Sequence, residues 1–180
     1  MSPEIQFLPL PQLQLDLSAE WNQNHDDGQW LGNFTDAGGV THYTFARLEQ
    51  ETHSVGVRVS YAMTTTLSFQ LYAAPFVSRG KYTNPRELSA TPRAEAYDDR
   101  YAAYTPPPGT SMGFDVLQLR SNSVLRWEFR PGSTLFAVWS HGRDGFDGQY
   151  LDRPWREEYD GLFALHPINT VLVKVAYLLD

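Results

Sequence analysis

The sequence predicts an all-β fold, an antiparallel up-and-down meander of about eight strands that forms a β-barrel or part of a larger one. Three observations lead to this prediction. Apolar and polar residues alternate with a period of two over most of the chain, whereas helical periods are scarce. Charged residues fall in the middle of the polar strand faces. The later strands are joined by connections that are alternately short and long, which places the two kinds at opposite ends of a meander.

The first half of the chain supplies five of the predicted strands. Residues 13–21 alternate Leu, Ala and Trp with polar neighbours, so one face lies in an apolar medium and the other in a polar one. Two segments rich in Asp and Gly, residues 25–28 and 36–39, are predicted to be turns. Pro75 disfavours pairing in a central strand beyond that point. The predicted strands of this half span residues 13–21, 29–35, 40–50, 53–61 and 67–73.

The second half contains two long irregular segments, residues 77–115 and 141–168. Segments of this length are uncommon inside compact domains and are often functional. Between them, Arg130-Pro131-Gly132-Ser133 forms a tight turn. The predicted strands of this half span residues 116–129, 134–140 and 170–179.

Length and composition bound the class of protein. The 180 residues suit one domain, and we expect a single β-barrel-like domain over residues 1–180. The net charge of −7 argues against a nucleic-acid surface. The absence of Cys excludes disulfides, Cys–zinc sites and thiol chemistry. No stretch reaches the roughly 20 apolar residues of a spanning helix, and the first eleven residues do not resemble a secretory signal peptide.

The alternation is compatible with two orientations of the strands. A transmembrane β-barrel has an apolar outer face, aromatic girdles, a polar lumen, short turns at one end and long loops at the other. Trp127 and Trp139 flank the turn at 130–133, as expected at a membrane interface. A soluble β-barrel or sandwich has the same alternation with the apolar side inward. In the first reading the lumen is lined by Arg58, Gln70, Arg120, Arg126, Glu128 and Lys174.

Several segments resemble one bacterial family. They are residues 45–50 (FARLEQ), 61–82 (YAMTTTLSFQLYAAPFVSRGKY), 120–139 (RSNSVLRWEFRPGSTLFAVW) and 169–177 (NTVLVKVAY). The family is an uncharacterised C-terminal β-barrel-like domain of outer-membrane proteins that usually carry an N-terminal module similar to family-nine carbohydrate-binding domains. The resemblance implies that this chain is the C-terminal fragment of a longer protein in the bacterial outer membrane. Barrels of this kind often end in an aromatic residue, whereas this chain ends Leu178-Leu179-Asp180.

Candidate chemistry is weak. Asp144, Asp147 and Asp152 offer oxygens to Ca²⁺, but their spacing does not match a known loop, so we expect no metal and no cofactor. The five His residues show no metal-binding spacing. Loop aromatics, Tyr97 among them, have the composition for stacking on sugar rings. Carboxylates that could cleave a glycosidic bond, if two were held close together, are Asp16, Glu20, Asp115 and Glu128.

These observations predict a structural role rather than an enzyme. We expect an outer-membrane β-barrel domain that anchors or displays a module, with passive uptake or saccharide binding through the long loops. Its partner would be the lipid bilayer. The first alternative is a soluble β-barrel that binds a ligand, and the second is a carbohydrate-active hydrolase that uses lumenal carboxylates.

Overall fold

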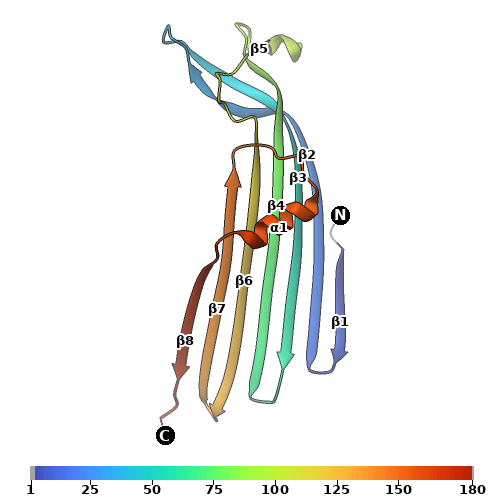
Figure 1. Cartoon of the computed structure of the whole chain (residues 1–180), viewed down its shortest axis with the longest axis vertical. Helices are drawn as coiled ribbons and strands as arrows, with labels where there is room; N and C mark the ends of the chain where they lie inside the picture. Colours follow the sequence, from blue (N-terminus) through green and yellow to red (C-terminus); the bar gives the residue numbers. More distant parts are fainter. Residues whose placement is uncertain (1–2, 180) are drawn as a thin grey trace.

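The computed structural model describes residues 3–179 and consists of one eight-stranded antiparallel sheet with a single α-helix against it (Figure 1). The strands follow the path β1-β2-β3-β4-β6-β7-β8, and the short β5 pairs with the upper end of β4. The elements are β1 (Glu4–Leu10), β2 (Leu13–Thr35), β3 (Thr41–Ala62), β4 (Leu67–Leu88), η1 (Asp98–Arg100), β5 (Tyr101–Ala103), β6 (Gly113–Arg130), β7 (Ser133–Asp147), α1 (Trp155–Ala164) and β8 (Ile168–Ala176).

The meander is confirmed, and the sheet is open. Strands that are consecutive along the path are hydrogen-bonded neighbours, and β1 and β8 form the two edges. The turns after β1, β3 and β6 are short and lie at the lower end in Figure 1. The long connections, residues 89–112 and 148–167, lie toward the upper end, as the alternation of loop lengths predicted.

The register gives the sheet two chemically different faces, because residues paired across an antiparallel ladder point to the same side. Leu15 is paired with Val59, and Val59 with Leu71. We call the side that they share the apolar face, and the opposite side the polar face. In its lower part the apolar face carries Leu13, Leu15, Leu17, Ala19, Val55, Val57, Val59, Tyr61, Leu67, Phe69, Leu71, Ala73, Leu125, Trp127, Leu135, Ala137, Trp139, Val171, Val173 and Val175.

Several predicted boundaries were wrong because turn signals lie inside long strands. The predicted turn at 25–28 is a bulge within β2, where the register shifts between Asp26 and Gln29. There the Gly28 N–H donates to Asp26 Oδ1 at 2.8 Å. Short polar side chains that bond their own backbone serve turns and bulges equally, so the local signal does not distinguish them. The same continuity joins residues 40–50 and 53–61 into β3.

Pro75 did not end its strand as predicted. The ladder between β4 and β6 continues through the pair of Pro75 with Leu119, and β4 extends to Leu88. The irregular segment predicted at 77–115 is therefore confined to 89–112, and β7 likewise extends to Asp147. The short β1, β5 and α1 were not predicted, because none of them has a long periodic pattern of its own.

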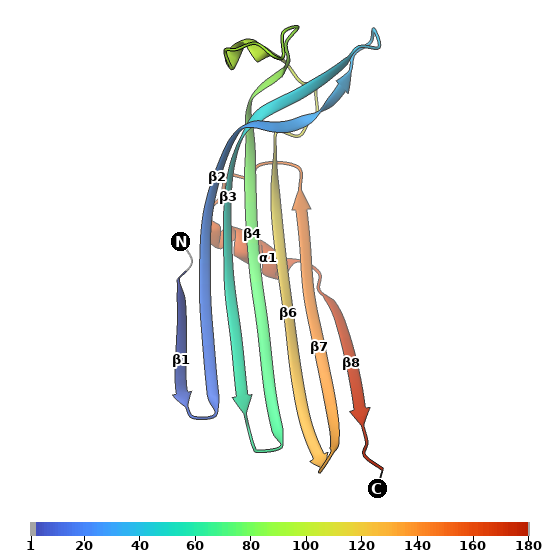
Figure 2. The same ribbon diagram turned by 180° about the vertical axis from the view of Figure 1, so that it is seen from behind.

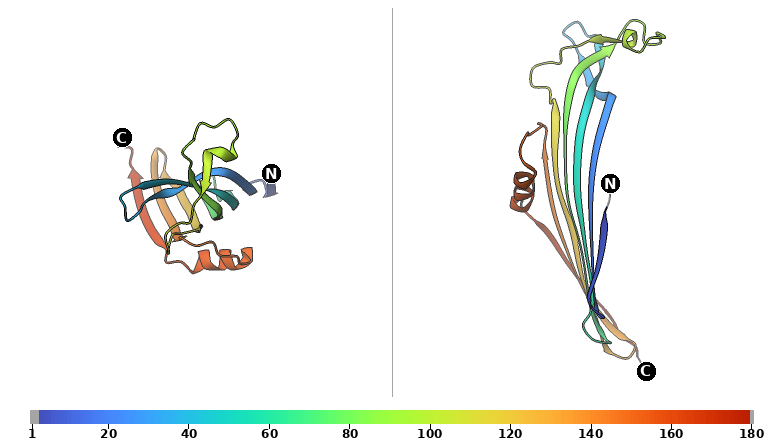
Figure 3. Two further views of the ribbon diagram at one scale, coloured as in Figure 1. Left: turned by 90° about the horizontal axis from the view of Figure 1, so that it is seen from above. Right: turned by 90° about the vertical axis from the view of Figure 1, so that its right-hand side faces the viewer.

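The buried core is small and lies beneath α1. Helix α1 crosses the apolar face and leaves the opposite face uncovered, as the rear view in Figure 2 and the two views in Figure 3 show. Leu162 is fully buried against Val77, Leu117 and Leu119, and Trp155, Tyr159 and Leu165 pack around them. Most other side chains of the apolar face are only partly buried or exposed. Burial by the chain itself therefore accounts for only the upper part of that face.

Gly80 is predicted to be essential for the packing of the upper sheet. A Cβ at residue 80 would lie 2.4 Å from the Phe114 ring and 3.0 Å from Leu48 Cδ1. We expect Gly80→Ala to lower the free energy of unfolding by roughly 1–3 kcal/mol, because overpacking forces neighbours to move. Denaturant unfolding of the folded chain measures this.

Gly142→Ala is the matched control, since its Cβ would approach only the end of the Arg120 side chain at 3.3 Å and a backbone oxygen at 3.7 Å. Equal losses in the two variants would contradict the packing argument.

Candidate functional site

All six residues predicted to line a lumen lie on the polar face. Arg58 is paired with Tyr72 across β3 and β4, and Tyr72 is paired with Asn122 across β4 and β6. Gln70, Arg120, Arg126, Glu128 and Lys174 share this side by the same register. A shallow hollow of about 420 Å³ lies over the middle of the face, with Asp16, Arg58, Gln70, Tyr72 and Asn122 in its lining.

Charged groups on the polar face are spread over it rather than gathered at one point. The Arg120 guanidinium donates to both carboxylate oxygens of Asp144 at 2.7 and 2.8 Å, and Gln118 donates to the same carboxylate at 3.0 Å. Arg126 donates to Glu128 at 3.4 Å. Lys174 on the edge strand makes no ion pair within residues 3–179. The arrangement provides a polar, partly charged surface without a convergent catalytic group.

The apolar face forms a band of defined height. On β4 it runs from Leu67 to Val77, which is eleven residues. At about 3.4 Å per residue and a tilt of about 40° in a barrel, this corresponds to a height of roughly 26 Å. The apolar belt of membrane barrels is about 25 Å tall. On β4 the apolar run therefore spans about the height of such a belt, and its upper end at Val77 is covered by α1.

Charged and polar residues delimit the band at its upper end. The next row of the same face holds Gln23, Glu51, Arg79, Asp115 and Asp147. One further row up are His25, Glu49 and Lys81. On β4 and β6 the change from apolar to charged side chains takes a single step of the register, from Val77 to Arg79 and from Leu117 to Asp115.

A buried charge cluster holds the segment before α1 against this upper row. Arg153 Nη2 lies 2.9 Å from Asp115 Oδ2 on β6 and 2.8 Å from Glu158 Oε2 on α1. Asp115 is 2% exposed and Glu158 is fully buried. We call these three residues the clasp. It ties loop, helix and sheet together through one guanidinium nitrogen.

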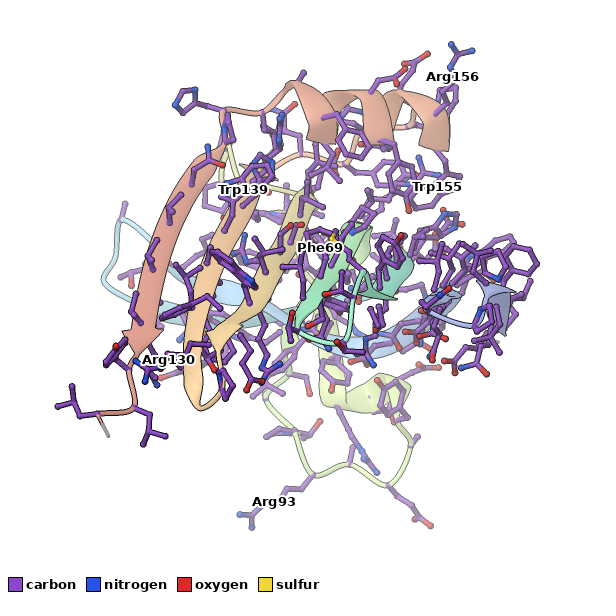
Figure 4. All side chains as sticks on the ribbon, turned by 90° about the horizontal axis from the view of Figure 1, so that it is seen from below. Phe69, Arg93, Arg130, Trp139, Trp155 and Arg156 are labelled. Atoms are coloured by element: carbon purple, nitrogen blue, oxygen red, sulfur yellow. The ribbon has the colours of Figure 1, made fainter. Side chains whose placement is uncertain are left out.

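A second link reinforces the clasp. Arg79 on β4 donates to the carbonyl oxygen of Arg153 at 2.6 Å and to Glu51 Oε2 at 2.9 Å. Its guanidinium also lies 4.3 Å from the centre of the Trp155 ring, which stacks on His53 at 3.5 Å. Figure 4 places Trp155 on the side of α1 that faces the sheet and Arg156 on the outer side. These contacts explain why α1 lies where it does.

The clasp has one more carboxylate than it has cations. Burial and the neighbouring Glu158 carboxylate raise the pKa of Asp115 to about 6, although Arg153 opposes the shift. Asp115 Oδ1 and Glu158 Oε1 have no hydrogen-bond partner among the described residues. A proton on Asp115 removes the repulsion between the two carboxylates, so protonation favours the closed clasp.

Sequence reasoning named Asp115 only as one of four dispersed carboxylates and missed Glu158, Arg153 and Arg79. The position of Asp115 could have been noticed in the sequence. It is separated from Leu117 and Leu119 by even numbers of positions, so it lies on the apolar face of its strand. The partners come from an irregular segment and a short helix, whose positions no periodicity specifies.

The remaining candidates do not converge. Asp144 lies on the polar face and Asp147 on the apolar face, and no group of three or more His, Cys, Asp or Glu in residues 3–179 is arranged to hold a metal. Asp16, Glu20 and Glu128 lie on the polar face, on the side opposite Asp115. Loop aromatics contact the protein itself: Tyr104 stacks on Phe34, and Tyr97 packs against Tyr101.

The chain matches the model of the family described as "Domain of unknown function (DUF5916)" over residues 3–180. It therefore belongs to this uncharacterised domain family. No curated protein and no solved structure matches the chain. Within the described residues, no helix has the length and hydropathy needed to cross a membrane.

Breaking the clasp is predicted to cost far more stability than breaking an ion pair of the polar face. Arg153→Met leaves two buried carboxylates without their cation, and we expect a loss of roughly 3–5 kcal/mol in the free energy of unfolding. Arg120→Met breaks a pair in which both side chains are about half exposed, and we expect a loss below about 1 kcal/mol. Denaturant unfolding of both variants compares them. Similar losses would show that the clasp does not hold the fold.

Stability is predicted to decrease as pH rises through the titration range of Asp115. In the unfolded chain the pKa of an Asp is about 3.9, whereas in the folded chain it is about 6. The folded state therefore binds more protons between these values, and the free energy of unfolding falls by roughly 1–3 kcal/mol from pH 4 to pH 7.

Asp115→Asn should flatten this part of the curve of stability against pH. Asp160→Asn is the control, because Asp160 is exposed on the same helix. A curve for Asp115→Asn that still falls like that of the unmodified chain would assign the pH dependence to another group.

Proposed function

We propose that the chain forms part of the wall of an outer-membrane β-barrel, with the apolar face toward lipid and the polar face toward the lumen. The role is structural: the wall anchors or displays a module and allows passive passage of small polar solutes. The six residues Arg58, Gln70, Arg120, Arg126, Glu128 and Lys174 would line the lumen. Saccharides would bind at the loops 89–112 and 148–167.

The observation that carries the proposal is the uncovered apolar band. A soluble domain rarely exposes a continuous apolar patch larger than a few hundred Å². Here Leu17, Trp127, Trp139, Val171, Val173 and Val175 are all about half or more exposed. Surrounded by lipid, these side chains need no further protein to cover them. The inner strands β3, β4, β6 and β7 each have a hydrogen-bonded neighbour on both sides.

The slope of the band supports the same orientation. Where α1 does not cover it, the band ends at Trp21 on β2 and at Trp139 on β7. Through the four ladders from β2 to β7, Trp21 is aligned with Gly145. The band ends at Trp139 on β7, so its upper limit lies six residues lower there than on β2. A horizontal plane through strands tilted by about 40° falls by about 1.2 residues per step, or roughly five in total. The slope suits a tilted barrel wall.

A soluble barrel is favoured by one observation, the packing of α1 against the apolar face. In that reading the face is an interior and the helix is part of its cover. Arg143 lies on the same face and donates to the carbonyl oxygen of Leu165 at 2.7 Å, beyond the last turn of α1. A hydrolase has less support, because the clasp carboxylates are buried and held by Arg153.

Quenching of tryptophan fluorescence by brominated lipid tests the orientation. In a variant whose only Trp is Trp139, bromine in the acyl chains should quench the emission several-fold, because the ring lies on the apolar band. Trp30 is more exposed than Trp139, 57% against 49%, but lies in the upper hairpin of β2 and β3, beyond the charged rows. A variant whose only Trp is Trp30 should therefore be quenched little. The proposal fails if the Trp139 variant is not quenched and the chain stays dissolved without detergent.

A further inference from the structure

The two edges of the sheet run in the same direction. The path contains seven strands, from β1 to β8, and each neighbouring pair is antiparallel. The first and last members of such a series of seven are parallel, and both arrows point downward in Figure 1. Direct pairing of β8 with β1 would therefore create a parallel junction in an otherwise antiparallel meander.

A second copy of the chain does not remove this conflict. If two copies have the same orientation in a membrane, β8 of one meets β1 of the other, and these strands are again parallel. Antiparallel pairing of β8 with a second β8 requires one copy to be inverted, which would place its long loops on the other side of the bilayer. Closure by copies of this chain alone is thus incompatible with a uniformly antiparallel barrel.

The edge strand β8 has the features of a surface that pairs with another strand. All nine of its residues are exposed, and its only partner within the described residues is β7. Val171, Val173 and Val175 extend the apolar face, while Lys174 lies on the polar face. An unpaired, β-branched edge of this length is a template for strand addition.

We propose that β8 pairs with an amphipathic strand that runs antiparallel to it, and that an odd number of additional strands completes the barrel between β8 and β1. This rests on the proposed function and extends it. The added strand places apolar side chains beside the three valines and a carboxylate within reach of Lys174, because opposite charges across a ladder are favourable. With seven strands present, an odd addition gives the even total of bacterial outer-membrane barrels.

The added strands belong to the same polypeptide, outside residues 1–180, because strands that neighbour each other in a meander usually follow one another in sequence. Glu4 on the edge strand β1 makes no ion pair within residues 3–179. We therefore expect a basic residue on the added strand that pairs with β1.

Photo-crosslinking in cells that make the full polypeptide tests this. A benzophenone amino acid is placed at Thr170 or at Ala176, which lie on the same face of β8 at its two ends, and the crosslinked peptides are identified by mass spectrometry. The expected partner is one alternating segment outside residues 1–180. In an antiparallel pair, the residue linked to 176 precedes the residue linked to 170 by about six positions. The same label at Ser68, inside the sheet, is the control and should link only within residues 3–179.

Links from β8 to Glu4–Leu10 of the same or a second copy would overturn the proposal. So would linked residues in the reverse order, which indicate a parallel pair. The absence of any link, together with rapid hydrogen exchange of the β8 backbone amides, would also overturn it. The outcome is separable from that of the lipid-quenching experiment. A soluble barrel completed by the same strands would give the expected links without quenching, whereas a membrane sheet closed by its own β1 would give quenching with links to β1.

Discussion

The structure depends on one constraint, the agreement between the period of two in the sequence and the register of the ladders. Each strand has its own alternation, but a common face arises only when neighbouring strands are aligned so that apolar residues pair with apolar residues. The pairs Leu15 with Val59 and Val59 with Leu71 satisfy this condition across three strands. A slip of one residue in any ladder would move a whole set of side chains to the other face, so the burial or lipid contact of that face fixes the register.

Helix α1 is held by charges as well as by apolar contact. Its single fully buried apolar side chain, Leu162, joins a cluster of only three buried sheet residues. Polar connections add to it: Arg153 bridges Asp115 and Glu158, and Arg79 binds the backbone of the same segment. Ion pairs as buried as these contribute less to net stability than their number suggests, because both charges lose their hydration. Their main effect is to define one position for the helix above the apolar band.

The two faces account for different parts of the proposed function. The polar face carries ion pairs that are local and exposed, such as that of Arg120 with Asp144. This pair is not part of the lining of the hollow, which includes Asp16, Arg58 and Gln70. The apolar face carries a band of bilayer height with charged residues above it. The open edges add a requirement that does not depend on the chemistry of either face. Because the path has seven alternating strands, its two edges are parallel, and antiparallel closure needs an odd number of further strands.

The sequence by itself determined the fold class, the meander, the placement of short and long connections, and the common side of all six predicted lumen residues. These follow from alternation, which is local and repeated in each strand. Tertiary structure decided the rest. Residues 25–28 became a bulge because β3 continues past them as a pairing partner. Asp115 gained its role from Arg153 and Glu158, which reach it from about forty residues away. The open sheet, the cover of α1 and the parallel edges result from long-range pairing, and no local pattern encodes the partner of an edge.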